Sequence, residues 1–200
     1  MVHKLVTLPM FPLNSLMIPG EVKVLRIFEE RYRELVQDCL NNKANFGMPF
    51  IKGDQLADYG MEVAINRIMD EKPNGEVDIE ITAVKPFKIV RYSSVLKPKL
   101  YGAAYIEEYE DSPISNRYKL FRSLKKFIKA AKSKEIPVET LINVSVYKVA
   151  LLLDLTNDEK LTLISFPNIK EKEDFLISKI KLYSQMFKLE QELKGNFRYN

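Results

Sequence analysis

Three prolines near the start of the chain, Pro9, Pro12 and Pro19, constrain its fold more than any other feature. Each proline removes a backbone N–H and fixes φ, so this segment cannot form a long helix, and the apolar residues around the prolines suit short strands. Beyond the prolines, the apolar residues take the spacing that is typical of a helix. The sequence therefore predicts one or two strands over residues 2–25 and a helix over residues 27–42.

The predicted helix carries apolar side chains at three- and four-residue spacing, which places them on one face. These residues are Phe28, Tyr32, Leu35, Val36, Cys39 and Leu40. We expect Asn41 and Asn42 to end the helix, because Asn tolerates the left-handed conformation that helix ends often need. Cys39 is the single cysteine of the chain, which excludes an internal disulfide and a cysteine-based zinc site, and we interpret it as a packing residue.

Alternating apolar and polar residues follow the helix and predict strands. One such strand is expected over residues 59–68, and the Pro73, Asn74 and Gly75 cluster predicts a hairpin turn into the next strand. We therefore expect residues 1–112 to form a mainly β domain with one inserted helix.

An acidic, turn-prone stretch over residues 107–113 marks the predicted domain boundary. Beyond it, helical spacing predicts long helices over residues 116–134 and 169–193. Thr156 and Glu159 have the spacing of a capping box at the start of a short helix. Residues 113–200 are thus predicted to form a helical bundle, and the fold class is α+β.

Catalytic and cofactor-binding motifs are missing from the 200 residues. The single histidine, His3, excludes a histidine-based triad and a multi-histidine metal site, and neither of the common glycine-rich phosphate-binding motifs occurs. We therefore predict a protein without enzymatic activity, metal or cofactor. No apolar run is long enough to span a bilayer and no signal peptide is evident, so we expect a cytoplasmic protein without membrane contact.

Positive charge is concentrated on the predicted helix over residues 117–134. This helix has about eight basic residues and no acidic one, whereas the formal net charge of the chain is only +4. Its face could contact nucleic acid or a membrane surface, or could simply be solvated, and the solvated interpretation is favoured. The candidate residues for an anionic partner are Arg122, Lys125, Lys126, Lys129 and Lys132.

Five segments of the sequence carry a family resemblance. In chain order they read LPMFPLNSLMIPG, LRIFEERYRELV, NFGM, YGMEVAI and KPFKIVRY. This order resembles the N-terminal substrate-binding domain of Lon proteases, the LON domain, and the run from Arg26 to Tyr32 is its most specific part. The similarity extends from about Leu5 to about Leu193.

The resemblance implies a PUA-like β barrel followed by a helical bundle. The residues that match the family motif are Pro12, Gly20, Arg26, Phe28, Glu29, Arg31 and Tyr32. We interpret them mainly as fold determinants: Phe28 and Tyr32 pack the helix on the sheet, and the charged residues fix nearby loops.

The functional expectation follows from the parts of a Lon protease that this sequence does not contain. The 200 residues contain neither the ATPase module nor the Ser-Lys peptidase module of a Lon protease. The resemblance therefore implies a non-catalytic protein that binds unfolded or partner polypeptides in protein quality control or regulation, and that can self-associate. Nucleic-acid binding through the PUA-like barrel and the basic helix is the alternative.

Overall fold

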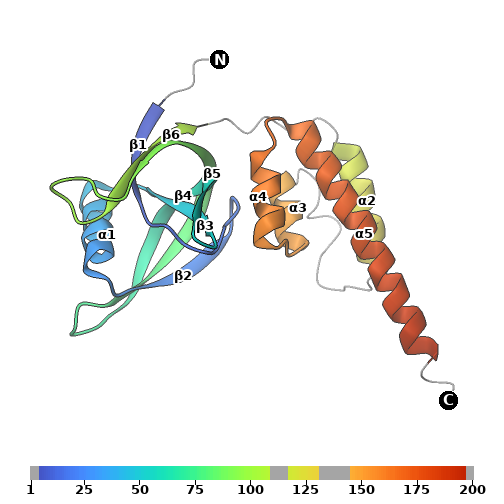
Figure 1. Ribbon diagram of the computed structural model, residues 1–200. Helices are drawn as coiled ribbons and strands as arrows, with labels where there is room; N and C mark the ends of the chain where they lie inside the picture. The colour runs from blue at the N-terminus through green and yellow to red at the C-terminus, as the bar shows by residue number, and fades with distance from the viewer. Residues whose placement is uncertain (1–4, 109–116, 131–144, 197–200) are drawn as a thin grey trace. The chain divides into compact units, whose positions relative to one another are not determined.

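The computed structural model describes residues 5–108, 117–130 and 145–196, and within them it contains a six-stranded sheet and five α-helices (Figure 1). The predicted α+β class is confirmed. The chain divides into two compact units. The first combines Met1–Glu110 with Thr156–Ser165, and the second combines Asp111–Leu155 with Phe166–Asn200.

The first unit contains the sheet and two helices. The strands are β1 (Leu5–Met10), β2 (Val22–Ile27), β3 (Phe46–Lys52), β4 (Gln55–Glu71), β5 (Val77–Ser93) and β6 (Gly102–Glu108). The helices are α1 (Glu30–Asn42) and α4 (Asn157–Ser165). The predicted turn at Pro73, Asn74 and Gly75 joins β4 to β5, and Gly75 has a φ of 80° there.

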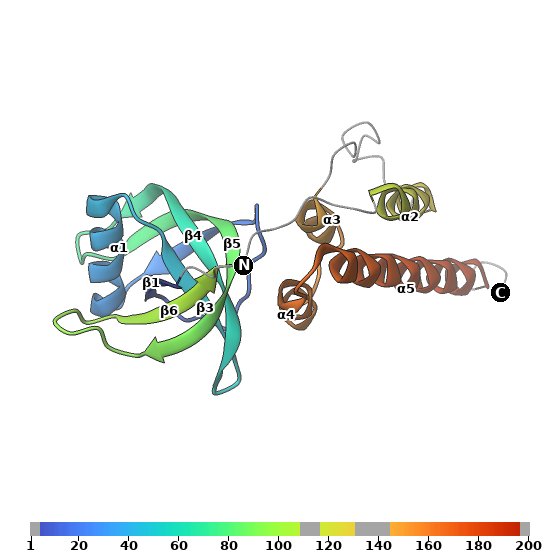
Figure 2. The ribbon, with the colours of Figure 1, turned by 90° about the horizontal axis from the view of Figure 1, so that it is seen from above.

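The sheet closes on itself through β6, which is antiparallel to both β1 and β5 (Figure 2). β3 is parallel to β1 and antiparallel to β4, and β4 is antiparallel to β5. These five strands therefore form a ring, and β2 is added outside it as a further antiparallel neighbour of β5. The PUA-like character of the barrel stays a prediction.

Large apolar side chains fill the ring. Leu8, Met10, Phe87 and Ile106 pack as one buried cluster with Ala104. Glycines in the neighbouring strands make room for them: a Cβ atom at Gly60 would lie 2.6 Å from the Phe87 ring, and one at Gly47 would lie 2.5 Å from Met10 Sδ. A larger residue at either position would therefore clash with the side chains that fill the ring.

Helix α1 buries the predicted apolar face, with Tyr32, Leu35, Val36 and Cys39 all buried. Burial raises the pKa of the Cys39 thiol to about 11, with a smaller contribution from the charge of Asp38, so the thiol is protonated at neutral pH. The helix ends at Asn42 as predicted, but the left-handed residue is Lys43, with a φ of 49°. A lysine therefore takes the conformation that we expected of an asparagine.

Helix α4 is tied to the loop between β1 and β2. The predicted capping box is confirmed, because Thr156 N donates to Glu159 Oε2 and Glu159 N donates to Thr156 Oγ1. Asn157 Oδ1 accepts a hydrogen bond from Leu16 N, and Lys160 Nζ donates to Glu21. Helix α4 thus groups with the sheet, and the predicted division into residues 1–112 and 113–200 stays a prediction.

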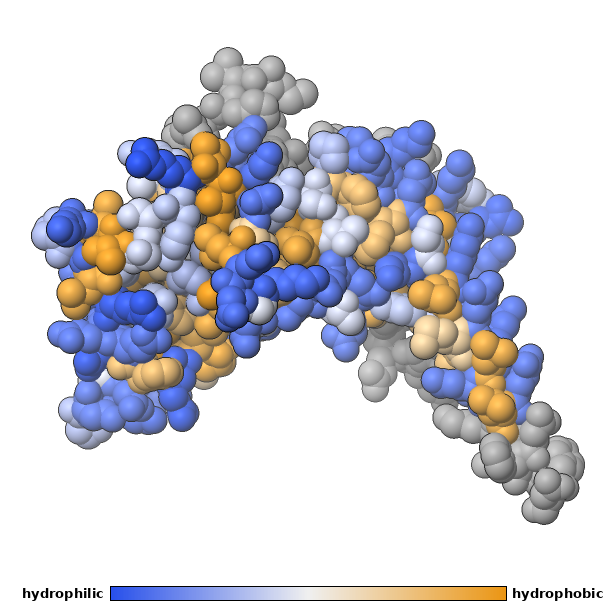
Figure 3. Space-filling model, viewed as in Figure 1, coloured by the Kyte–Doolittle hydropathy of each residue, from blue (hydrophilic) through white to orange (hydrophobic). Residues whose placement is uncertain are grey.

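The second unit contains α2 (Arg117–Ala130), α3 (Val146–Leu152) and α5 (Ile169–Asn196), with α2 and α3 packed on α5. Leu176 and Ile180 of α5 are buried, as their helical spacing predicts. Farther along α5, an exposed apolar stripe runs over the C-terminal half of the helix (Figure 3). The α5 seam, as we call it, consists of Leu182, Met186, Leu189 and Leu193.

A hydrogen-bonded cluster ties α1 to the loop between β5 and β6. Tyr101 Oη donates to Asp38 Oδ2 over 2.6 Å, and Lys99 Nζ lies 2.6 Å from the same oxygen. Leu100 N donates to the carboxylate of Glu34. The hydrogen bonds from Lys99 and then Tyr101 hold the pKa of the Asp38 carboxyl below its ordinary value.

This lowered pKa predicts a loss of stability in acid. A carboxyl group with a lowered folded-state pKa stabilises the fold above its unfolded-state pKa, near 3.8 for Asp, and the stabilisation disappears as the pH falls through the folded-state value. We expect the contribution of Asp38 to the free energy of unfolding, measured by urea titration, to be lost as the pH falls from about 5 to below 3.8. The isosteric variant Asp38→Asn should lose less over this interval, and an identical pH dependence in both proteins would contradict the expectation.

Candidate functional site

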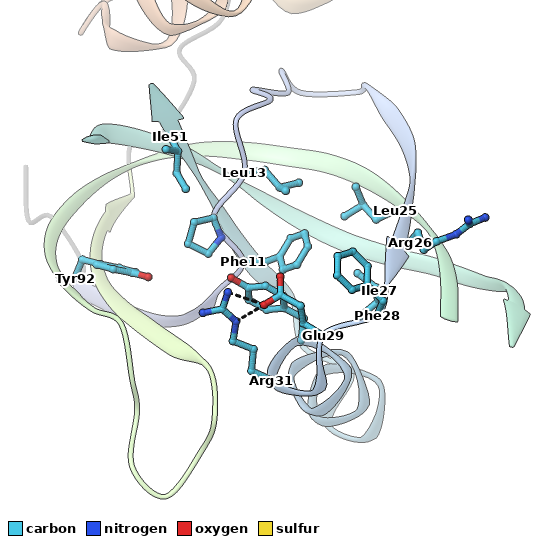
Figure 4. A pocket seen from close by; sticks show the side chains of 12 residues that line it. Phe11, Leu13, Leu25, Arg26, Ile27, Phe28, Glu29, Arg31, Ile51 and Tyr92 are labelled. Atoms are coloured by element: carbon cyan, nitrogen blue, oxygen red, sulfur yellow. Dashed lines mark hydrogen bonds and ion pairs between the residues drawn. The ribbon is translucent and has the colours of Figure 1, made fainter. Parts of the chain in front are cut away.

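A pocket with a volume of about 430 Å³ opens in the first unit, where β2 leads into α1 (Figure 4). Its walls come from the segment after β1, from β2 and the start of α1, and from single residues of β3 and β5. The lining residues are Phe11, Pro12, Leu13, Leu25, Arg26, Ile27, Phe28, Glu29, Arg31, Tyr32, Ile51 and Tyr92. We call it the Phe28 pocket.

Phe28 lies on the two-residue connection between β2 and α1 and is 62% exposed. Its neighbours take the core positions: Ile27 is buried at the end of β2, and Tyr32 is buried in the first turns of α1. The expectation that Phe28 packs the helix on the sheet is therefore wrong, whereas for Tyr32, which is buried, it stays a prediction. Phe28 precedes the helix, so it does not share the helical face that its spacing suggested.

Aromatic rings form the floor of the pocket. Phe11 meets Tyr32 edge to face, with ring centroids 4.2 Å apart, and contacts Phe46 in the same manner at 6.2 Å. Burial raises the pKa of the Tyr32 hydroxyl, so the group is neutral at physiological pH. These ring contacts form a packed apolar surface in the pocket.

The charged residues of the pocket are already paired. Arg31 forms a salt bridge of 2.7 Å with Glu29, and its guanidinium lies over the Tyr32 ring, 4.5 Å from the centroid. Arg26 holds Asp78 with two hydrogen bonds of 3.0 and 3.2 Å, which lower the pKa of the Asp78 carboxyl. Since each arginine has its own carboxylate, the rim carries little unbalanced charge.

The lining of the pocket is mainly apolar and aromatic. Its lining contains neither a serine nor a cysteine nucleophile, and among the described residues no group of His, Cys, Asp and Glu could hold a metal ion. The aliphatic side chains of Leu13, Leu25 and Ile51 lie along one side of the aromatic floor. Such an arrangement can accommodate a large apolar side chain of a ligand.

The structure brings most of the family-motif residues together around this pocket. Pro12, Arg26, Phe28, Glu29, Arg31 and Tyr32 all line it. Gly20 lies elsewhere, in the turn before β2, where its φ is 87° and its N–H donates to Ala83 O. The sequence did not identify Leu25, Ile51 and Tyr92 as site residues, because only the strand pairing brings them to the pocket.

The basic residues of α2 lie in the second unit. Arg122, Lys126 and Lys129 are exposed, and Lys125 is half-buried, with Nζ 5.9 Å from the centroid of the Phe121 ring. Lys132 lies outside the described residues. Leu120, Leu124 and Ile128 are buried on the other side of the helix. Nucleic-acid binding by the basic residues stays a prediction.

None of the helices in the described parts of the chain is long and apolar enough to cross a membrane.

Comparisons with known proteins identify relatives over most of the chain. The family model described as the ATP-dependent protease La (LON) substrate-binding domain matches residues 7–181. The crystal structure of a Lon N-terminal domain protein from Xanthomonas campestris is similar, with a TM-score of 0.65 and 26% sequence identity over 86% of this chain and 98% of the other. The N-terminal domain of a Mycobacterium avium complex Lon protease shares the fold, with a TM-score of 0.66 and 14% identity over 88% and 98% of the two chains. The search of curated proteins found no match.

The exposure of Phe28 predicts that this residue contributes little to stability. We expect Phe28→Ser to change the free energy of unfolding by less than about 0.5 kcal/mol, as for most surface substitutions. Leu35→Ala, at a fully buried position of α1, should cost roughly 2 to 5 kcal/mol. Urea titration followed by circular dichroism measures both, and equal losses in the two variants would show that Phe28 stabilises the fold.

Proposed function

Because the chain belongs to the ATP-dependent protease La (LON) substrate-binding domain family, we propose that it binds polypeptides and that the Phe28 pocket is the binding site. The observation that carries this assignment is the exposed ring of Phe28 above an apolar, aromatic-floored pocket. Large aromatic side chains left in water at the edge of a pocket are typical of binding surfaces.

The character of the pocket indicates which polypeptides it takes. An unfolded chain exposes apolar side chains that a folded protein buries, and burying one of them contributes roughly 1.5 to 3 kcal/mol. The paired charges of Arg26 and Arg31 give no strong preference for a charged ligand. The protein therefore acts as a non-catalytic recognition protein for unfolded or partner polypeptides, in protein quality control or regulation.

Binding to one model protein in two states tests this function. We expect the chain to bind reduced and carboxymethylated ribonuclease A and to ignore the native, disulfide-bonded form, as measured by fluorescence anisotropy. Phe28→Ser should weaken binding about tenfold or more, since about 1.4 kcal/mol corresponds to a factor of ten. Tyr118→Ser is the matched control, because Tyr118 is an exposed aromatic residue of the second unit.

Two outcomes of this experiment contradict the proposal. Equal indifference to the unfolded and native forms removes polypeptide binding as the function. Equal losses of affinity in Phe28→Ser and Tyr118→Ser remove the Phe28 pocket as its site.

We also propose that the protein self-associates through the α5 seam. Leu182, Met186, Leu189 and Leu193 follow the alternating spacing of four, three and four residues that pairs helices in coiled coils. An antiparallel pair of copies places Leu182 opposite Leu193 and Met186 opposite Leu189. This seam is too apolar to be left in water without cost.

Charges on α5 favour the antiparallel arrangement. In a parallel pair, Lys179 continues the seam and faces its own copy, which is repulsive. In the antiparallel pair, Glu190 lies beside Tyr183 of the second copy and Glu192 lies beside Gln185, so no like charges meet.

Sedimentation measurements test the self-association. We expect dimers whose population rises with protein concentration, and we expect the double variant Met186→Glu and Leu189→Glu to remain monomeric because it introduces charge at the centre of the seam. Lys188→Glu, on the side of α5 away from the seam, is the control and should still dimerise. A wild-type chain that remains monomeric at the highest concentrations contradicts the proposal.

A further inference from the structure

Strand β2 has a free edge within the described structure. The sheet order is β2-β5-β4-β3-β1-β6, and among the described strands β2 pairs with β5 only. The ring closes through β5 and β6, so it leaves β2 outside. Such an edge presents unpaired N–H and C=O groups at every second residue, which can pair with another strand.

The Phe28 pocket adjoins this free edge. Its lining includes the consecutive residues Leu25, Arg26 and Ile27. Successive side chains of a strand point to opposite faces, so these consecutive residues show that the pocket lies at the margin of β2, where the strand leads into α1. Figure 4 shows β2 along one side of the pocket and the segment with Phe11 and Leu13 along another.

The opposite wall cannot offer the same backbone pairing. Phe11 N donates to Gly47 O, Leu13 N donates to Pro49 O, and Leu13 O accepts from Ile51 N, so these groups already pair with β3. Pro12, between them, has no N–H. Backbone groups that a ligand can use are therefore on the β2 side of the pocket.

Strand β2 carries two charged side chains, Lys23 and Arg26, but two other features that protect an edge are missing from it. It contains no proline, and its pairing with β5 is regular over all six residues. Val22 and Val24 are 52% and 57% exposed, so apolar side chains flank the free backbone on the outer face. An extended apolar segment fits beside such a strand.

We propose that the polypeptide ligand binds as an extended strand added to the free edge of β2, with every second side chain directed to the Phe28 pocket. This inference rests on the proposed function and specifies its mode. Main-chain hydrogen bonds to β2 supply affinity for any sequence, and the pocket adds a preference for apolar residues at alternate positions. Most strands of a folded protein already pair with one another, so a folded protein offers far fewer backbone groups for such pairing than an unfolded chain does.

Backbone N-methylation of a defined peptide tests strand addition. The probe is a labelled, acetylated peptide in which Thr and Phe alternate over seven residues between terminal lysines. Variants carry one N-methyl group at each position in turn, and anisotropy gives each affinity. We expect losses of about tenfold at every second position, where the N–H pairs with β2, and little change at the positions between.

The outcomes separate this mode from the proposed function. If every methylated peptide binds like the parent while Phe28→Ser abolishes binding, the pocket binds polypeptide without strand addition. Uniform losses at all positions also overturn strand addition, because backbone pairing has a period of two. Binding of unfolded ribonuclease but not of the peptide overturns it as well, since backbone pairing does not depend on sequence. Failure of both ligands removes the proposed function itself.

Discussion

The pairing of β5 with three other strands is the constraint on which the first unit depends. This 17-residue strand pairs with β4 along most of its length, while β2 lies beside its first half and β6 beside its second half. Irregularities in the β4–β5 and β5–β6 registers let the strand bend between the two neighbours. The second half thus closes the ring, and the first half holds β2 outside it.

The candidate site is a consequence of this closure. The chain passes from the end of β2 into α1 through a two-residue connection that lines the pocket, and Phe28 lies on that connection. Ile27 and Tyr32, which precede and follow Phe28 in the sequence, take the buried positions, and the Phe28 ring is left in solvent. The edge contact between Phe11 and Tyr32 then closes the floor beneath it. A single topological feature therefore explains the free strand edge, the pocket and the exposed aromatic residue.

Local signals predicted much of the fold, and long-range pairing limited the prediction of the site. The capping box at Thr156 and Glu159 and the hairpin turn at Gly75 depend on residues close in sequence, so they were predictable. The burial of Phe28 was predicted wrongly, because helical spacing does not reveal that the helix starts two residues later at Glu30. Ile51 and Tyr92 reach the pocket only through the register of β3 and β5, which the sequence pattern does not determine.

The neutral rim of the Phe28 pocket bears on the proposed preference for unfolded over folded polypeptides of many different sequences. If Arg26 and Arg31 were unpaired, they would select acidic ligands and bind them even on folded surfaces, where charged residues are exposed. Their pairing with Asp78 and Glu29 removes this attraction and keeps the side chains in place. What remains is apolar surface beside free backbone groups, and a ligand can satisfy both only if its own apolar side chains and its own backbone are unpaired. The selection for the unfolded state that we propose would then follow from the chemistry of the site, without any recognition of a particular sequence.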